Sequence, residues 1–504
     1  MTNSSPMYQR RDPSLSFVRD TVHAFMGEGW RDVGQLDFTY VDRLCEWAVS
    51  ADSQVAKAAT AAIFGGIIEQ FCDDFSDEGV TAGNLVLSRI LQWLRVTPQG
   101  AELDCRLNDF GFADGDALLQ RYLRVSQPRQ LGPDRLDTLR KVFVLSRVTA
   151  GADIAITSVI VHRLRKRLPH TELVLIGPGH LVELFASVAD CRYRDFVYKN
   201  DGGLFVKMTS WPRLLEVVAE ECEGLSAHEV LLFDPDTRLS QLGLLPLLPG
   251  DNTCYFPSRF HPKQEFAGCN LSVLTNEWLN LLLDEKERWQ PSIVFPSNGE
   301  DYHSFVQSLY GLGCRLVVTV NFGVGNDPRK RVHDEFETGL VSKLLGIPGT
   351  VVILDTGRGE QKEQWVTSHF DSVLGLGLPA VRLAETELQG YCPAFGHGLI
   401  VFTGVLGSLG KMIDAGDCFV GYDSCGQHLA AATRTPAVII FSGAPSQRFI
   451  QRWSPDVPGS ITIPIRGSVS TNEATELLIQ TVIRAVAEIR DGRLQKENYD
   501  FDKE

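Results

Sequence analysis

The chain has little of what marks secreted, membrane-spanning or metal-stapled proteins. Its 11 cysteines include no Cys-x-x-Cys pair, so reduced, buried thiols are favoured over a disulfide framework or a zinc site. The segment 1–13 is polar and lacks an apolar signal core, and no apolar run approaches the length of a transmembrane helix. We therefore expect a cytoplasmic protein without a transmembrane segment.

An excess of basic charge is also missing. The chain has 48 Lys and Arg residues against 63 Asp and Glu residues, a net charge of −15, which argues against nucleic acid as a partner. Its 44% hydrophobic and 22% charged residues are ordinary for a soluble protein with large cores. A length of 504 residues suggests about three domains.

The first part of the chain has the pattern of helices. In 40–75 and 81–96, apolar residues recur at helical spacing. We predict an α-helical accessory domain over 1–135, which serves docking or oligomerisation. This domain contains one acidic run, most simply a solvated helix end: Asp73, Asp74, Asp77 and Glu78.

From residue 141 onward, short apolar runs alternate with amphipathic segments. This alternation predicts parallel, doubly wound sheets of the α/β class. A first set of strands lies between 142 and 233, and a second set between 316 and 441. We expect two tandem Rossmann-like domains that face a cleft, 136–312 and 313–490, followed by a tail, 491–504.

One stretch combines a strand, a polar turn and a helix start. The strand 418–422 runs into Asp423 and Ser424, which have the chemistry of helix N-caps, and Gly426 permits a close backbone approach. A helix N-terminus after a strand presents free N–H groups that can hold an anion, and His428 can reach the same place. The simpler alternative is a capped helix with a buried polar turn.

This stretch resembles the donor-site signature of the heptosyltransferase-like glycosyltransferases of family 9. Residues 423–432 read Asp-Ser-Cys-Gly-Gln-His-Leu-Ala-Ala-Ala, and a Thr-Pro-led strand follows at 435. Cys425 stands where the family usually has glycine, which follows one place later. The resemblance implies a GT-B fold and a nucleotide-diphosphate sugar as co-substrate, with ADP-heptose as the family's candidate and no cofactor. It assigns the donor to five residues of the turn: Asp423, Ser424, Cys425, Gly426 and His428.

Inverting glycosyl transfer also needs a proton acceptor beside the acceptor hydroxyl. Gly151-Ala152-Asp153 lies between the strand 142–145 and the next helix. Family 9 enzymes carry a Gly-Asp pair at this turn, at the mouth of the cleft. The resemblance implies that Asp153 is the catalytic base, although here Ala152 separates it from the glycine. The alternative is a carboxylate that caps the helix.

A second turn would lie across the cleft. Asn321 and Gly323 end a strand, and Lys330 and Arg331 follow. The family has a similar Asn-x-Gly turn before a basic pair. The resemblance implies that Lys330 meets the charge of the leaving diphosphate, with Arg331 as the second candidate. The alternative is a solvated basic loop.

Other polar side chains follow strands. Asp234, Asp236, Arg238 and Arg259 come after two strands of the first domain and are candidates for acceptor contacts. Glu360 could touch the donor's nucleoside hydroxyls, or lie in a surface loop. The simpler role for the two aspartates is a turn and an N-cap. Asp-Pro-Asp also looks like the metal motif of the GT-A fold, which we reject because a helix N-terminus and a lysine can neutralise the diphosphate.

The sequence thus predicts an inverting, metal-independent glycosyltransferase. Its acceptor, a lipid core, a protein or a small metabolite, stays open, as do the donor sugar and the oligomeric state. The alternatives are a sugar-nucleotide epimerase on the same fold and a non-catalytic scaffold whose helices recruit partners.

Overall fold

Two parallel β-sheets form the centre of the computed structural model, which describes residues 15–198, 203–249, 252–295, 299–325, 327–356, 362–465, 467 and 469–492. The first sheet has the order β3-β2-β1-β4-β5 and the second β12-β11-β10-β6-β7-β9-β8, and every neighbouring pair is parallel. This confirms the predicted pair of Rossmann-like sheets.

The strands have these bounds: β1 Lys141–Leu145, β2 Glu172–Gly177, β3 Cys191–Asp195, β4 Val230–Asp234, β5 Thr253–Tyr255, β6 Leu316–Asn321, β7 Thr350–Asp355, β8 Ala380–Ala384, β9 Gly398–Thr403, β10 Cys418–Tyr422, β11 Ala437–Phe441 and β12 Ile461–Pro464. Central strands such as β1, β4 and β10 are buried along their whole length. Continuous apolar runs of this kind are typical of parallel sheets covered on both faces.

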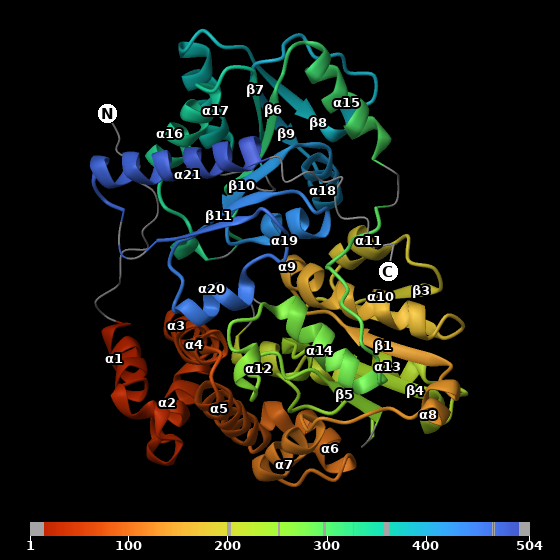
Figure 1. The fold of residues 1–504 in the computed structure, drawn as a ribbon. Coiled ribbons are helices and arrows are strands. Elements are labelled where there is room, and N and C mark those ends of the chain that lie inside the picture. Colours follow the sequence, from red (N-terminus) through yellow and green to blue (C-terminus); the bar gives the residue numbers. More distant parts are fainter. Residues whose placement is uncertain are drawn as a thin grey trace.

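The helices before the first sheet are α1 Ser16–Phe25, α2 Thr39–Ala48, α3 Ser53–Ala61, the π-helix η4 Ala62–Ile68, α4 Glu69–Asp74, α5 Asp77–Arg95, α6 Ala101–Asp109, α7 Gly115–Val125 and α8 Pro133–Asp137. We call them the N-terminal helices. In Figure 1 they lie in red and orange beside the first sheet.

The helices of the two sheets are α9 Ala150–Ala152, the π-helix η6 Asp153–Thr157, α10 Ser158–Arg167, α11 His180–Phe185, α12 Leu204–Met208, α13 Trp211–Glu221, α14 Leu271–Leu283, α15 Glu300–Gly311, α16 Asp334–Leu345, α17 Lys362–Gly375, α18 Leu406–Ala415, α19 Cys425–Ala432, α20 Gln447–Trp453 and α21 Asn472–Gly492. Two short 3₁₀ turns also matter below, η8 Arg238–Ser240 and η11 Pro328–Lys330.

The N-terminal helices do not form a core of their own. Along β1, Phe143 and Leu145 pack into one core with the N-terminal helices, whereas Val142 and Val144 pack into another with η6 and α10. Successive side chains of a strand point to opposite faces of the sheet. The helices therefore cover one face of the first sheet, and the boundary expected at residue 135 separates elements but not cores.

The two sheets are also joined through a continuous core. Ile154 and Val159 of the first half share one apolar cluster with Leu409, Leu429 and other residues of α18 and α19. Helices α9 and η6 contact α19 directly. The junction between the two halves is therefore packed at this point.

One apolar helix is longer than the sequence suggested. Helices α3, η4 and α4 run on as one stretch, Ser53–Asp74, whose 22 residues and mean hydropathy of 1.2 would allow it to cross a membrane by length and composition. The expectation that no stretch approaches this length is therefore not upheld. This is weak evidence for a span, because Ile63, Ile67 and Phe71 are fully buried in the protein core.

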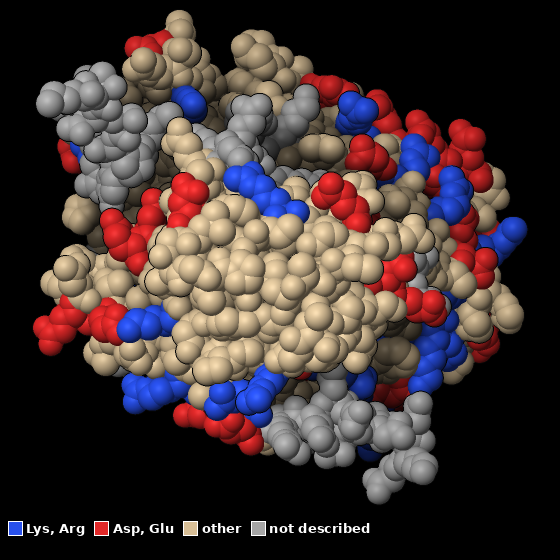
Figure 2. Space-filling model, turned by 90° about the horizontal axis from the view of Figure 1, so that it is seen from above, with Lys and Arg blue, Asp and Glu red and all other residues tan. Residues whose placement is uncertain are grey.

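On the face drawn in Figure 2, charged side chains lie around the edge rather than in the middle. Seen from above, one face has a broad area without Lys, Arg, Asp or Glu, ringed by side chains of both signs (Figure 2). None of the 11 cysteines forms a disulfide in the structure, but Cys105 and Cys392 are exposed, so the expectation of buried thiols holds for only part of the set.

Candidate active site

The turn between β10 and α19 joins a strand to a helix start as predicted, but its N-cap differs from the expectation. Ser424 stands at the N-cap with extended backbone, φ −156° and ψ −173°, but no side chain caps the helix. Its Oγ is buried and has no hydrogen-bond partner among the residues that the structure describes. The first N–H groups of a helix have no partner inside the helix. The turn thus places a buried hydroxyl at the positive end of a helix dipole.

Asp423 does not cap this helix but holds Lys330 beside it. The Lys330 Nζ lies 2.6 Å from Asp423 Oδ2, and the Gln427 side chain donates to Oδ1 at 2.6 Å. Nζ also lies 5.5 Å from the centre of the Phe449 ring, and a quarter of the lysine side chain is exposed. The structure therefore brings Asp423, Ser424 and Lys330 together, as the sequence predicted.

His428 is a packed residue rather than an open one. It is 6% exposed, and its ring centre lies 5.8 Å from that of Trp453. Burial, aided by the charge of Lys330, lowers the pKa of His428 to about 3, so its imidazole is neutral at physiological pH. His428 lies between the two halves of the protein, against Gly151, where it can support the turn by packing but brings no charge to it.

Two glycines near the turn are required for packing. A Cβ on Gly151 would lie 2.8 Å from His428 Cδ2 and 3.3 Å from Cys425 Cα, so this glycine lets α9 approach α19. A Cβ on Gly426 would lie 2.5 Å from Cζ of Phe419. The close approach expected at Gly426 is therefore made to this ring.

Asp153 is buried and its carboxylate is fully engaged. Ser146 Oγ and the His180 ring bond to Oδ2 at 2.6 and 2.8 Å, whereas the backbone N–H of Arg147 and the Thr157 hydroxyl donate to Oδ1, both at 2.7 Å. Its exposed fraction is 0%, but the His180 side chain is 18% exposed.

This environment corrects two expectations about Asp153. Thr149, not Asp153, stands at the N-cap of α9. Asp153 is also no open carboxylate, because all its contacts lie inside the first half of the protein. What sequence reasoning missed is His180, at the start of α11 after β2. A single histidine matches no motif in the sequence, and only the structure shows that His180 lies next to Asp153.

The second donor turn is only partly available. Asn321 ends β6, where its Nδ2 donates to Asp355 and its Oδ1 accepts from the Gly323 N–H at 3.0 Å. Arg331 instead pairs with Glu337, which is fully buried. The role of Arg331 as a donor contact is therefore corrected to a structural one, since that carboxylate would otherwise be unpaired. Glu360 lies outside the described residues.

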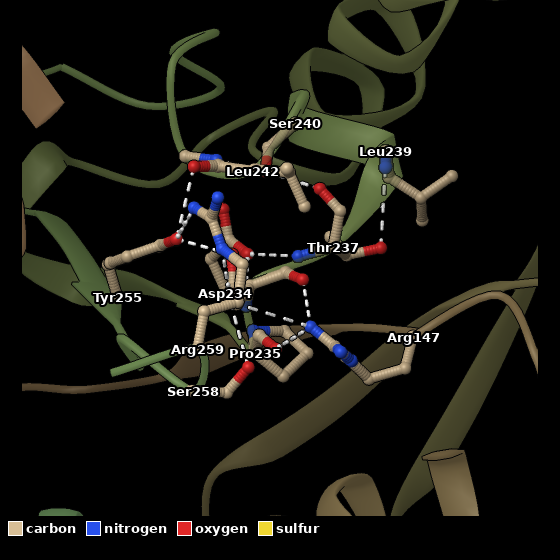
Figure 3. Close-up of polar contacts among 12 residues, drawn as sticks. Arg147, Asp234, Pro235, Thr237, Leu239, Ser240, Leu242, Tyr255, Ser258 and Arg259 are labelled. Atoms are coloured by element: carbon tan, nitrogen blue, oxygen red, sulfur yellow. Dashed lines mark hydrogen bonds and ion pairs between the residues drawn. The ribbon is translucent and has the colours of Figure 1, made fainter. Parts of the chain in front are cut away.

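The two aspartates of the Asp-Pro-Asp segment are buried, and Figure 3 shows the polar contacts around Asp234 and Pro235. Asp234 is 1% exposed and accepts the N–H groups of Asp236 and Thr237, at 3.0 and 3.2 Å. Arg147 donates to the Pro235 carbonyl at 2.9 Å. Asp234 thus has the turn role that the sequence offered as the alternative, and it is not open to an acceptor.

Asp236 and Arg259 form a buried ion pair. Arg259 Nε lies 3.0 Å from Asp236 Oδ2, and Tyr255 and Ser258 also donate to this carboxylate. Arg259 reaches Asn84 on α5 at 3.2 Å. Burial alone would raise the pKa of Asp236. The guanidinium groups of Arg259 and Arg147 outweigh this effect and lower the pKa. The acceptor roles expected for Asp236 and Arg259 are therefore corrected to a link between the first sheet and the N-terminal helices.

The acidic run is not a solvated helix end. Asp74 pairs with Arg31 at 3.2 Å and with Arg448 of α20 at 3.1 Å. Asp73, beside it, is half-buried. No local pattern in the sequence separates these two aspartates from Asp77, which is exposed.

Neither the family models nor the curated proteins searched gave a match. Among solved structures, a family 9 glycosyl transferase from Veillonella parvula matches with a TM-score of 0.49 and 14% identity over 73% of this chain and 99% of that chain. The E. coli ADP-heptose LPS heptosyltransferase II matches at 0.45 and 13%, over 70% and 100%. The E. coli heptosyltransferase WaaC with ADP matches at 0.44 and 11%, over 68% and 99%. The chain is similar to these proteins in fold.

The contact of α9 with α19 gives a first prediction. Gly151→Ala should lower the free energy of unfolding by about 1–3 kcal/mol, because the new methyl group collides with His428 and Cys425. Chemical denaturation measures this. Gly132→Ala is the control, since a Cβ there meets nothing within 4 Å. Equal stability of the two variants would contradict a tight contact.

The buried ion pair gives a second prediction. Asp236→Asn should lower the free energy of unfolding by about 3–5 kcal/mol, because it leaves the Arg259 cation buried without its partner. The exposed Asp134→Asn should change it by less than about 0.5 kcal/mol. If Asp236→Asn instead melts like the wild type but loses activity, Asp236 is an acceptor contact after all.

Proposed function

We propose that the protein transfers a sugar from a nucleotide-diphosphate sugar, and that the N-terminus of α19 holds the diphosphate. The observation that carries this is the buried, unpartnered Ser424 Oγ at an uncapped helix start, beside Lys330. Buried polar atoms nearly always have a hydrogen-bond partner. An anion at this turn would supply one, and helix dipole and lysine would together stabilise its charge.

The nature of the donor rests on the sequence. The resemblance of 423–432 to the family 9 signature favours an ADP-linked sugar, with heptose as the first candidate. His428 stays neutral beside the turn, so the positive charge available to the diphosphate comes from Lys330 and the helix. The acceptor is a separate question, taken up below.

We propose that His180 takes the proton of the acceptor hydroxyl and that Asp153 positions it. When Nε2 of His180 donates its hydrogen to Asp153, Nδ1 is left as a free proton acceptor. The carboxylate then stabilises the imidazolium that forms. Asp153 thereby contributes to the reaction by orienting His180, whose side chain is partly exposed.

In this reaction the acceptor oxygen bonds to the anomeric carbon while the bond from that carbon to the diphosphate oxygen breaks. The hydroxyl proton goes to His180, and the electron pair leaves with the nucleoside diphosphate. Attack opposite the leaving group inverts the anomeric centre. We propose that no metal takes part, because the N-terminus of α19 and Lys330 can neutralise the diphosphate, and because Asp236 of the Asp-Pro-Asp segment is already bonded to Arg259, Tyr255 and Ser258.

The diphosphate site is tested with ADP as the probe in calorimetry. Ser424→Ala removes a hydroxyl that has no partner in the described structure, so the fold should be unchanged while ADP binding weakens about threefold to tenfold, the worth of one hydrogen bond. Lys330→Gln should weaken it further. The control is Ser342→Ala on α16, a half-buried serine away from the turn. Unchanged ADP affinity in both site variants would refute the assignment.

The base is tested by release of ADP from ADP-heptose. His180→Ala should lower turnover by about 10²–10⁴-fold and leave ADP affinity unchanged. Asp153→Asn should also be slow. The control is the exposed His170→Ala. Full turnover in His180→Ala with loss in Asp153→Asn would make the carboxylate itself the base.

A further inference from the structure

The N-terminal helices reach the turn between β10 and α19, residues 423–426, which we call the diphosphate turn. At the end of α4, Asp74 pairs with Arg448, and the Phe75 ring centre lies 6.3 Å from that of Phe449. Phe449 is also the ring over which Lys330 lies. In Figure 1 the end of α4 is beside α20. A residue at this end of α4 is therefore placed within the active site rather than at the outer surface.

Asp73 occupies that place. It accepts no hydrogen bond and forms no ion pair within the described part of the chain. Its charged neighbours are Glu69 on α4, Arg238 on η8, and Arg329 and Lys330 on η11. Burial, together with the charge of Glu69, raises the pKa of Asp73 to about 7. The carboxylate is thus held among cations from both halves of the protein and bonded to none of them.

Three buried polar atoms lie near Asp73. They are the Arg238 Nη1, the Tyr198 hydroxyl and the Gln241 Oε1. The Tyr198 hydroxyl and the Gln241 side chain lie close enough to interact with each other, and none of the three atoms has another hydrogen-bond partner in the residues described. Tyr198 is 6% exposed and Gln241 1%. Arg238 is an electrostatic neighbour of both Asp73 and Tyr198, and Tyr198 lies beside Gln241. We call Asp73, Tyr198, Arg238 and Gln241 the polar junction.

Buried groups of this kind are rarely left unsatisfied, so several at one place indicate a bound polar molecule. The polar junction offers donors, from Arg238 and Tyr198, and acceptors, from Asp73 and Gln241. Hydroxyl groups both donate and accept, and a molecule with several of them can satisfy all four residues.

We propose that the polar junction is the acceptor subsite, that its ligand is a polyhydroxylated molecule of the carbohydrate class, and that Asp73 and Arg238 decide which hydroxyls are accepted. This rests on the proposed function, because Lys330 links the polar junction to the diphosphate turn. The N-terminal helices thereby supply part of the active site.

The probes are the methyl glycosides of glucose, mannose and N-acetylglucosamine, offered to the full chain saturated with ADP. Saturation-transfer NMR detects binding, and titration measures affinity. We expect at least one glycoside to bind. Tyr198→Phe removes one hydroxyl and keeps the ring, so the fold should be retained, and it should weaken glycoside binding at least threefold. Thermal melting checks that the variant is folded. Asp73→Ala and Arg238→Gln should weaken it at least fivefold. ADP affinity should stay within twofold in the Tyr198 and Arg238 variants.

The control is Asp77→Asn, an exposed aspartate from the same acidic run, which should bind the glycosides like the wild type. Binding of ADP without binding of any methyl glycoside would overturn the subsite and leave the proposed function standing. Unchanged glycoside affinity in all three junction variants would overturn it as well. Failure of the wild-type protein to bind ADP would overturn both proposals together.

Discussion

The contact between α9 and α19 fixes how the two halves of the candidate site face each other. Gly151 lies against His428 and Cys425, so the loop after β1 and the turn after β10 are held in one arrangement. Asp153 and His180 depend on the first of these segments, and Ser424 and Lys330 on the second. The apolar core that continues from η6 to α19 makes this arrangement part of the protein's stability. The residues proposed for the reaction thus lie at the same interface as the residues that hold the two halves together.

Much of the architecture follows from local patterns. Parallel strands buried on both faces are continuous apolar runs, and β1, β6 and β10 could be predicted for that reason. The half-buried edge strands β3, β8 and β12 carry mixed side chains, and they escape such a search. The strand, turn and helix start at 418–432 could be predicted because their residues are consecutive. Lys330 joins them from another turn, and only the family resemblance pointed there.

The errors have a common physical origin. Asp236, Arg259 and Arg331 look like site residues because each follows a strand and is charged, but their partners decide otherwise. Arg259 bonds to Asn84, 175 positions away in the chain, and Asp74 to Arg448, 374 positions away. No local pattern shows whether a buried charge has a counter-ion. For the same reason His180 was not named from the sequence, and Asp73 was interpreted as part of a solvated helix end. The neighbours that matter for each of them lie on other elements.

The alternation along β1 has a consequence for the chain as a whole. Phe143 and Leu145, with Val174 and Ile176 of β2, turn one face of the first sheet toward the N-terminal helices. A protein trimmed to its two sheets would therefore present a bare, flat apolar surface to solvent, and surfaces of that kind drive aggregation. The N-terminal helices are thus not an appendage that can be removed while the two sheets stay folded. Shortened versions of this protein would be expected in inclusion bodies rather than as soluble fragments.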